Sequence, residues 1–133
     1  MSMIHSCRVA AILSLALLAV PAFTQARPGG NVLDRLESGL WELRGTGGAG
    51  LGSICLGDRY ILTQPKHRAA ACARDVVASD PRSVTVRYSC PGIGFGRTMI
   101  RFETPRLVQI VSLGVDRGAP FAVRAEARRT GGC

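Results

Sequence analysis

The sequence predicts a mainly β domain, an antiparallel curled sheet or partial barrel of about seven strands with one or two short helices and two disulfides. Three observations predict this class. Apolar and polar residues alternate along several runs in the second half of the chain. Prolines separate these runs and exclude long helices there. An even set of cysteines remains once a predicted N-terminal signal peptide is removed, which is typical of a disulfide framework.

Residues 1–26 have the pattern of a secretory signal peptide. Arg8 supplies the positive flank, Val9–Val20 is an uncharged apolar run, and small residues follow, with cleavage near Ala26 or alternatively Ala22. The apolar run is about 12 residues long, short of the ~20 needed to cross a bilayer. The sequence therefore predicts a periplasmic or secreted protein without a transmembrane anchor after cleavage.

Cleavage removes Cys7 and leaves the cysteines for a single β-rich domain over residues 27–133. We expect these to form two disulfides in an oxidising compartment. Several pairings are possible, and the preferred one joins the nearest neighbours because they close the shortest loops. The preferred pairs are Cys55–Cys72 and Cys90–Cys133.

The second half of the chain is expected to form an antiparallel meander with short turns. Val84, Val86 and Tyr88 share one face of the first run, opposite Arg87. The third run is apolar on both faces apart from Gln109 and Ser112, which predicts a strand covered on both sides. The predicted strands are Ser83–Cys90, Thr98–Glu103, Leu107–Leu113 and Phe121–Arg129.

The first half is less regular. Asn31–Glu37 predicts a short helix with Asn31 as its N-cap, ended by Gly39. Asp58–Ala70 is expected to be a helical or irregular excursion. The predicted strands of this half are Leu40–Arg44, Leu51–Leu56 and Cys72–Ala78.

Two glycine clusters, Gly45–Gly52 and Gly92–Gly96, have spacings like those of nucleotide-binding loops. A dinucleotide fingerprint needs a strand before it and a helix after it, and a phosphate-binding loop needs a following Gly-Lys-Ser/Thr. Neither cluster has this context. We interpret both as turns or bulges where glycine supplies positive φ angles.

The chain carries 17 basic and 9 acidic residues, a formal net charge of +8, and Lys66 is its single lysine. Arginine holds its charge and forks onto phosphate or carboxylate, so an anionic partner is one interpretation. The candidate anion-binding residues are Arg87, Arg101, Arg124 and Arg128. The alternative is a solvated face on which Glu103 and Glu126, instead of forming a carboxylate pair, make weak charge pairs with neighbouring arginines.

No catalytic constellation is evident. His67 is the only histidine after the signal peptide, and its basic neighbours predict a solvated loop. A triad of Ser53, His67 and Asp75 exists on paper, but no serine has the context of a nucleophile elbow. The cysteines lack the spacing of a metal site or of a CxxC redox pair. The sequence predicts no enzyme activity, no cofactor and no metal; a small hydrolase using His67 is a lesser alternative.

Several short motifs together resemble a known family. They are GLWELR (Gly39–Arg44), ICLGD (Ile54–Asp58), Cys72, YSCPG (Tyr88–Gly92) and RRTGGC (Arg128–Cys133). This order is similar to domain-of-unknown-function family 3617 (DUF 3617), small exported proteins of Gram-negative bacteria. The resemblance covers roughly Gly39–Cys133. It implies a periplasmic β-rich domain with paired cysteines and implies no activity or binding residue.

The leading functional hypothesis is a non-enzymatic, disulfide-stabilised binding or interaction module. The apolar concave face has two interpretations, core packing or a site for a small apolar ligand, and core packing is favoured. The rival hypothesis is a binder of anionic envelope lipid or polymer through the arginine-rich face. Nucleic acid is not expected as a partner, because the aromatic residues are scattered. The concave face is predicted to comprise Trp41, Val84, Val86, Ile100, Phe102, Phe121 and Val123.

Overall fold

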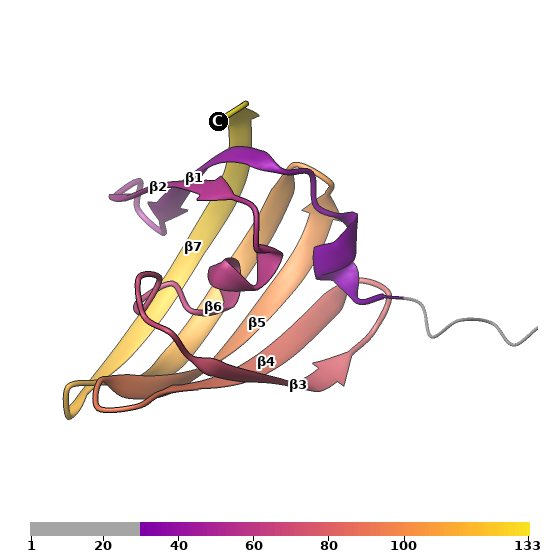
Figure 1. Ribbon diagram of the computed structural model, residues 1–133. Coiled ribbons are helices and arrows are strands. Elements are labelled where there is room, and N and C mark those ends of the chain that lie inside the picture. Colours follow the sequence, from indigo (N-terminus) through magenta and orange to yellow (C-terminus); the bar gives the residue numbers. More distant parts are fainter. Residues whose placement is uncertain (1–29) are drawn as a thin grey trace, which may run out of the picture.

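The computed structural model describes residues 30–133, so the predicted signal peptide, with Cys7 and both cleavage positions, lies outside the described residues. The described chain forms one seven-stranded antiparallel sheet and two 3-10 helices (Figure 1). The elements in order are η1 (Val32–Arg35), β1 (Gly39–Gly45), β2 (Gly50–Leu56), η2 (Arg59–Thr63), β3 (Ala73–Ser79), β4 (Ser83–Cys90), β5 (Gly94–Thr104), β6 (Leu107–Asp116) and β7 (Ala119–Gly131).

The strands lie in the order β2-β1-β7-β6-β5-β4-β3. The predicted meander is confirmed, because β4 to β7 follow one another across the sheet. After β2 the chain crosses one face of the sheet through η2 and reaches β3 at the opposite edge (Figure 1). This crossing segment, residues 57–72, is the excursion expected from the sequence.

The expectation of a curled sheet or partial barrel is wrong. Closure requires the two edge strands to pair, and β2 and β3 stand at opposite edges of one open sheet. The apolar face is covered instead by η1, η2 and the crossing segment. These elements bury the core without a closed barrel.

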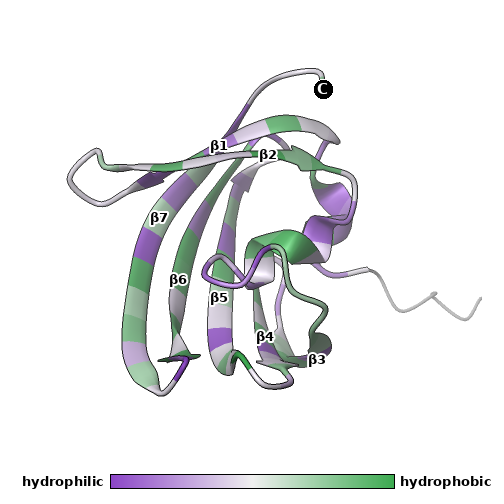
Figure 2. Ribbon diagram, turned by 60° about the vertical axis from the view of Figure 1, so that its left-hand side comes forward, coloured by the Kyte–Doolittle hydropathy of each residue, from purple (hydrophilic) through white to green (hydrophobic). Residues whose placement is uncertain are grey.

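Each strand has an inner face, toward η1 and η2, and an outer face turned away from them. In β4 the alternate residues Val84, Val86, Tyr88 and Cys90 are all buried, as predicted. Figure 2 shows hydrophobic and hydrophilic bands following one another along β7. The prediction that β6 is covered on both sides is wrong. Its outer face carries Leu113, which is 58% exposed, because no element of residues 30–133 packs over that face.

The two 3-10 helices are joined to each other and to the sheet. Asn31 caps η1 as predicted, its side-chain oxygen accepting from Leu33 N at 2.9 Å, and its Nδ2 donates to Tyr60 Oη in η2 at 2.7 Å. Trp41 Nε1 donates to the carbonyl of Glu37 at 3.0 Å.

The residues predicted to form an apolar concave face mostly fill the core. Four of its residues are fully buried and two more pack against them: Trp41, Val84, Val86, Ile100, Phe102 and Val123.

The four cysteines form two disulfides, but the preferred pairing is wrong. The bonds are Cys55–Cys133 and Cys72–Cys90. Strand order sets this connectivity. Cys72 precedes β3 and faces Cys90 at the end of the neighbouring β4. Cys55 of β2 and Gly131 of β7 both pair with Leu40 of β1, which brings the C-terminus beside Cys55.

The glycine clusters serve two different purposes. Gly47 and Gly48, with φ of 95° and 85°, form the β1–β2 turn as predicted. Gly94 and Gly96 instead lie within β5 and provide space on the inner face. A Cβ at Gly96 would lie 2.7 Å from the Tyr88 ring, and one at Gly94 would lie 3.0 Å from His67 Nε2.

Candidate functional site

The outer face of the sheet gathers arginine side chains from three strands. Arg87 of β4 stands directly opposite Arg97 of β5. On β5 the residues Arg97, Met99 and Arg101 follow one another on the outer face, with one inward-facing residue between each. Arg124 of β7 pairs with Val111 of β6, which in turn pairs with Met99. Since neighbouring strands are about 4.8 Å apart, these four arginines surround Met99 and Val111. We call Arg87, Arg97, Arg101 and Arg124 the arginine set.

A hollow of 590 Å³ lies on this face, and we call it the outer groove. Met99 and Val111 line its apolar part, while Gln109 and Glu126 line it beside the positive charges. The arginines that line it are Arg44, Arg101 and Arg124. The outer groove therefore combines several fixed positive charges with apolar surface.

The predicted anion-binding residues differ in how far they are already paired. Arg87 is 3.7 Å from Asp75, Arg101 is 2.7 Å from Glu103 and Arg128 is 3.1 Å from Glu126. These pairs confirm the charge-pair interpretation of Glu103 and Glu126. Arg124 has no ion pair with any carboxylate of residues 30–133.

Arg97 is a candidate that the sequence analysis missed. Its side chain is exposed on the outer face and, among the described residues, makes no ion pair. Two arginines directly opposite each other repel across an antiparallel pair. The missed signal was the start of β5, which lies at Gly94 rather than Thr98 and places Arg97 in alternation with Arg101.

Glu126 is the carboxylate that lines the outer groove, and neighbouring side chains donate hydrogen bonds to it. Hydrogen bonds from Gln109, at 3.2 Å, and from Arg128 hold the pKa of Glu126 below its usual range. Glu126 is therefore ionised at neutral pH, with both oxygens engaged. Glu126 forms no ion pair with any of the three arginines that line the outer groove. Arg44 is paired with Glu42 and Arg101 with Glu103, so Arg124 is the groove arginine without a carboxylate partner among residues 30–133.

The same face exposes a group of apolar side chains toward the turns that follow β4 and β6. Phe95 is 55% exposed, Met99 43% and Leu113 58%. Phe95 pairs with Val115, and Met99 pairs with Val111, so these residues are contiguous across β5 and β6. We call Phe95, Met99, Val111, Leu113 and Val115 the apolar patch.

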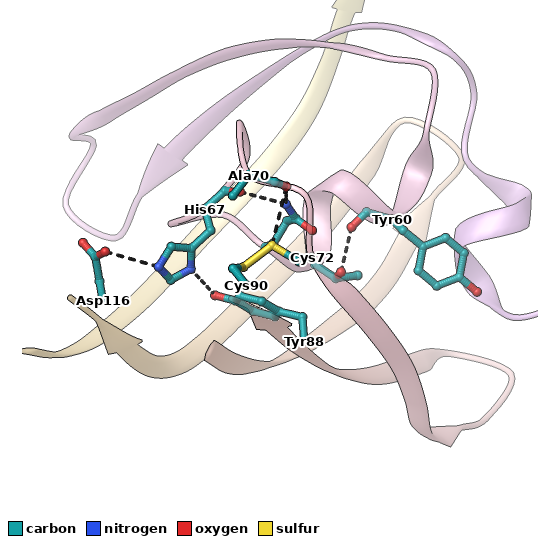
Figure 3. Close-up of a disulfide and its surroundings, with 9 residues drawn as sticks. Tyr60, His67, Ala70, Cys72, Tyr88, Cys90 and Asp116 are labelled. Carbon is teal, nitrogen blue, oxygen red and sulfur yellow. Dashed lines mark hydrogen bonds and ion pairs between the residues drawn. A yellow bond between two sulfur atoms is a disulfide. The ribbon is translucent and has the colours of Figure 1, made fainter. Parts of the chain in front are cut away.

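His67 contradicts the expectation of a solvated loop, because it is 5% exposed on the inner face. Figure 3 shows it between Asp116 and Tyr88, near the Cys72–Cys90 disulfide. Its Nε2 is 3.3 Å from Asp116 Oδ1, and its Nδ1 is 3.1 Å from Tyr88 Oη. The two rings meet edge to face. This cluster attaches the crossing segment to the sheet.

The chemistry of the partners assigns the hydrogen bonds of His67. A carboxylate oxygen accepts and a tyrosine hydroxyl can donate, so the geometry fits the tautomer in which Nε2 donates to Asp116 and Nδ1 accepts from Tyr88. Both ring nitrogens are therefore engaged. Burial is the main cause that raises the pKa of Tyr88, Asp116 raises it further, and a hydrogen bond with Ser112 opposes the rise.

The hypothetical triad of Ser53, His67 and Asp75 does not come together in the structure. Ser53 lies on β2 and Asp75 on β3, at opposite edges of the sheet, and Asp75 is paired with Arg87 on the outer face. The partner of His67 is Asp116, which the sequence analysis did not single out. Asp116 comes 49 residues after His67, and only the strand order reveals that they meet.

The fold and the site define a disulfide-bonded domain with one open sheet, a covered inner face and a cationic outer face. Within residues 30–133, no helix is long and apolar enough to span a membrane. No group of three or more metal-ligating side chains occurs in that part of the chain. Comparisons with family models, with curated proteins and with solved structures return no match. The resemblance to DUF 3617 therefore stays a prediction.

Proposed function

We propose that this protein is an exported, non-enzymatic binding module that attaches to a phosphate-rich component of the cell envelope through its outer face. The observation that carries the proposal is the outer groove, where Arg101 and Arg124 flank the apolar Met99 and Val111. Arginine suits phosphate because its planar fork donates two parallel hydrogen bonds.

The distribution of charge supports this choice. Arg97 and Arg124 have no carboxylate partner among residues 30–133, and Arg97 faces Arg87 directly. Like charges held together destabilise a sheet when nothing compensates them. A bound anion would relieve this repulsion and supply the missing partners.

The inner face offers less to a ligand. Its apolar residues are packed under η1 and η2, and both nitrogens of His67 are engaged. These contacts favour a structural role for the inner face, and the proposal therefore assigns binding to the outer face.

The test is binding of the oxidised protein to soluble polyphosphate, measured by titration at increasing salt. Each arginine near an anionic surface contributes about 1 kcal/mol, so Arg97→Gln with Arg124→Gln is expected to weaken binding about 30-fold. Salt is expected to weaken binding of the unmodified protein as well.

Arg82→Gln is the matched control. Arg82 is exposed in the β3–β4 turn and does not line the outer groove. Arg82→Gln removes one positive charge, as Arg124→Gln alone does, and is expected to change binding little in comparison with that single variant. Affinity that ignores salt, or an equal loss in the Arg82 variant, would show that the outer face is not a specific anion site.

A further inference from the structure

We infer that the partner of the outer face is an anionic lipid bilayer, which the protein contacts with the apolar patch as well as with its arginines. This inference rests on the proposed function and narrows it from phosphate-bearing components in general to a membrane surface. The observation behind it is the juxtaposition of the apolar patch and the arginine set on one uncovered face.

The side chains of the apolar patch lie on the outer face, outside the hydrophobic core. Phe95 and Leu113 are more than half exposed, at 55% and 58%, and they point away from the core. A soluble polyanion would engage the arginines and leave these side chains in water. A bilayer would bury them among acyl chains while the arginines reach the phosphates.

The position of the patch suits contact with a surface. Phe95 and Val115 lie next to the turns after β4 and β6, at one end of the sheet. Arg117, whose side chain is 78% exposed, and Lys66 lie at the same end and line a hollow with Ile93. Asp116 is the carboxylate in that hollow, and Lys66, His67 and Arg117 all contact it.

Arg117 thus lies at the end of the apolar patch and the arginine set lies along it. Cations beside apolar side chains are the arrangement of peripheral proteins that bind anionic leaflets. A second copy of the chain is the competing occupant of an apolar patch. It fits less well, because the patch would bring the arginine set of one copy close to that of the other.

The experiment compares two probes, vesicles containing phosphatidylglycerol in phosphatidylcholine and soluble polyphosphate. The variant Phe95→Gln with Leu113→Gln is expected to lose vesicle binding by a factor on the order of ten, with polyphosphate binding unchanged. Val77→Gln is the matched control, since Val77 is 40% exposed on β3 and lies outside the patch. Thermal unfolding verifies that each variant is folded.

A second readout places the contact directly. Trp41 is fully buried, so a Phe95→Trp variant adds a solvent-exposed indole whose emission is expected to shift to the blue on anionic vesicles. Brominated acyl chains are expected to quench this added emission.

The outcomes separate the two proposals. If the wild type binds neither probe, the proposed function fails. If it binds polyphosphate and the glutamine pair leaves vesicle binding intact, the proposed function stands and the bilayer contact is overturned. A stable dimer in sedimentation velocity that the glutamine pair dissociates would also overturn the inference, since a second copy would then cover the patch.

Discussion

At the scale of single residues, Tyr88 is held on the inner face by contacts with two neighbouring elements. Its ring lies over Gly96, where a Cβ would approach to 2.7 Å, and its hydroxyl contacts His67. Glycine in the middle of a strand lowers intrinsic stability. Glycine at position 96 leaves room for the Tyr88 ring, and glycine at position 94 avoids a clash with the carbonyl oxygen of Val115 on β6.

Tyr88 makes stability depend on alkaline pH. Burial raises the pKa of Tyr88 in the folded protein above its usual value, while the unfolded chain ionises near pH 10. The contribution of Tyr88 is therefore complete below about pH 10 and is lost as pH rises toward the folded pKa. We expect urea unfolding to show a declining free energy above about pH 10.

Tyr88→Phe isolates this effect. The variant loses the hydroxyl and its hydrogen bond, so it is expected to be less stable at neutral pH by about 1 kcal/mol. Its free energy of unfolding should fall less steeply above about pH 10 than that of the wild type. Parallel pH profiles for the two proteins would contradict the assignment.

At the scale of elements, the decisive arrangement is the pair of 3-10 helices over the inner face. Neither helix is longer than 5 residues, so each depends on tertiary contacts rather than on helix propensity. Asn31 provides the connection, because it caps η1 and donates to Tyr60 of η2. Arg59 adds a second connection through the carbonyl of Leu36, at 2.8 Å.

Replacing Asn31 tests this connection. Asn31→Ala removes the cap and the bond to Tyr60 and is expected to lower the free energy of unfolding by about 1–2 kcal/mol. Tyr60→Phe removes only the bond between the helices and keeps the cap, so it should cost less. Chemical denaturation measures both, and an equal loss in the two variants would assign no stability to the cap.

At the scale of the whole molecule, the two disulfides join parts of the sheet at very different separations. The Cys72–Cys90 bond spans 18 residues between neighbouring strands, and the Cys55–Cys133 bond spans 78 residues across β1. Each disulfide has one cysteine in or next to an edge strand, Cys55 in β2 and Cys72 just before β3. They therefore hold the edge strands β2 and β3 of a sheet that has no closure to protect it.

Loss of the longer loop should cost more stability. Loop-closure entropy assigns about 4.5 kcal/mol to Cys55–Cys133 and about 3 kcal/mol to Cys72–Cys90. Paired alanine variants, compared by urea unfolding, are expected to follow this order. Peptide mapping without reduction checks the connectivity itself, and a Cys55–Cys72 peptide would contradict it.

Local patterns in the sequence were sufficient to predict the strands. The alternation of Val84, Val86 and Tyr88 against Arg87 located β4 from Ser83 to Cys90 without error. Asn31 located the start of η1 because a capping side chain acts on residues next to it. All seven strands were expected near their observed positions.

Features that depend on strand order could not be obtained in this way. Asp116 meets His67 only because β6 lies under the crossing segment, and Cys133 meets Cys55 only because β7 pairs with β1. The role of Gly96 likewise depends on a ring from the neighbouring strand. Four arginines were recognised as candidates from their residue type. Arg97 was missed because the predicted strand began at Thr98, whereas β5 begins at Gly94.

The pairing of β1 with β7 also means that the sheet is continuous only when β7 is present. A chain that stops before Ala119 has all the other strands but no β7, so β2–β1 and β6–β3 would be two separate sheets. Cys133, the partner of Cys55, is synthesised after Cys72 and Cys90, which pair with each other. An unreacted Cys55 thiol therefore marks a chain that does not yet extend to Cys133, and its disappearance marks a chain in which β7 has paired with β1.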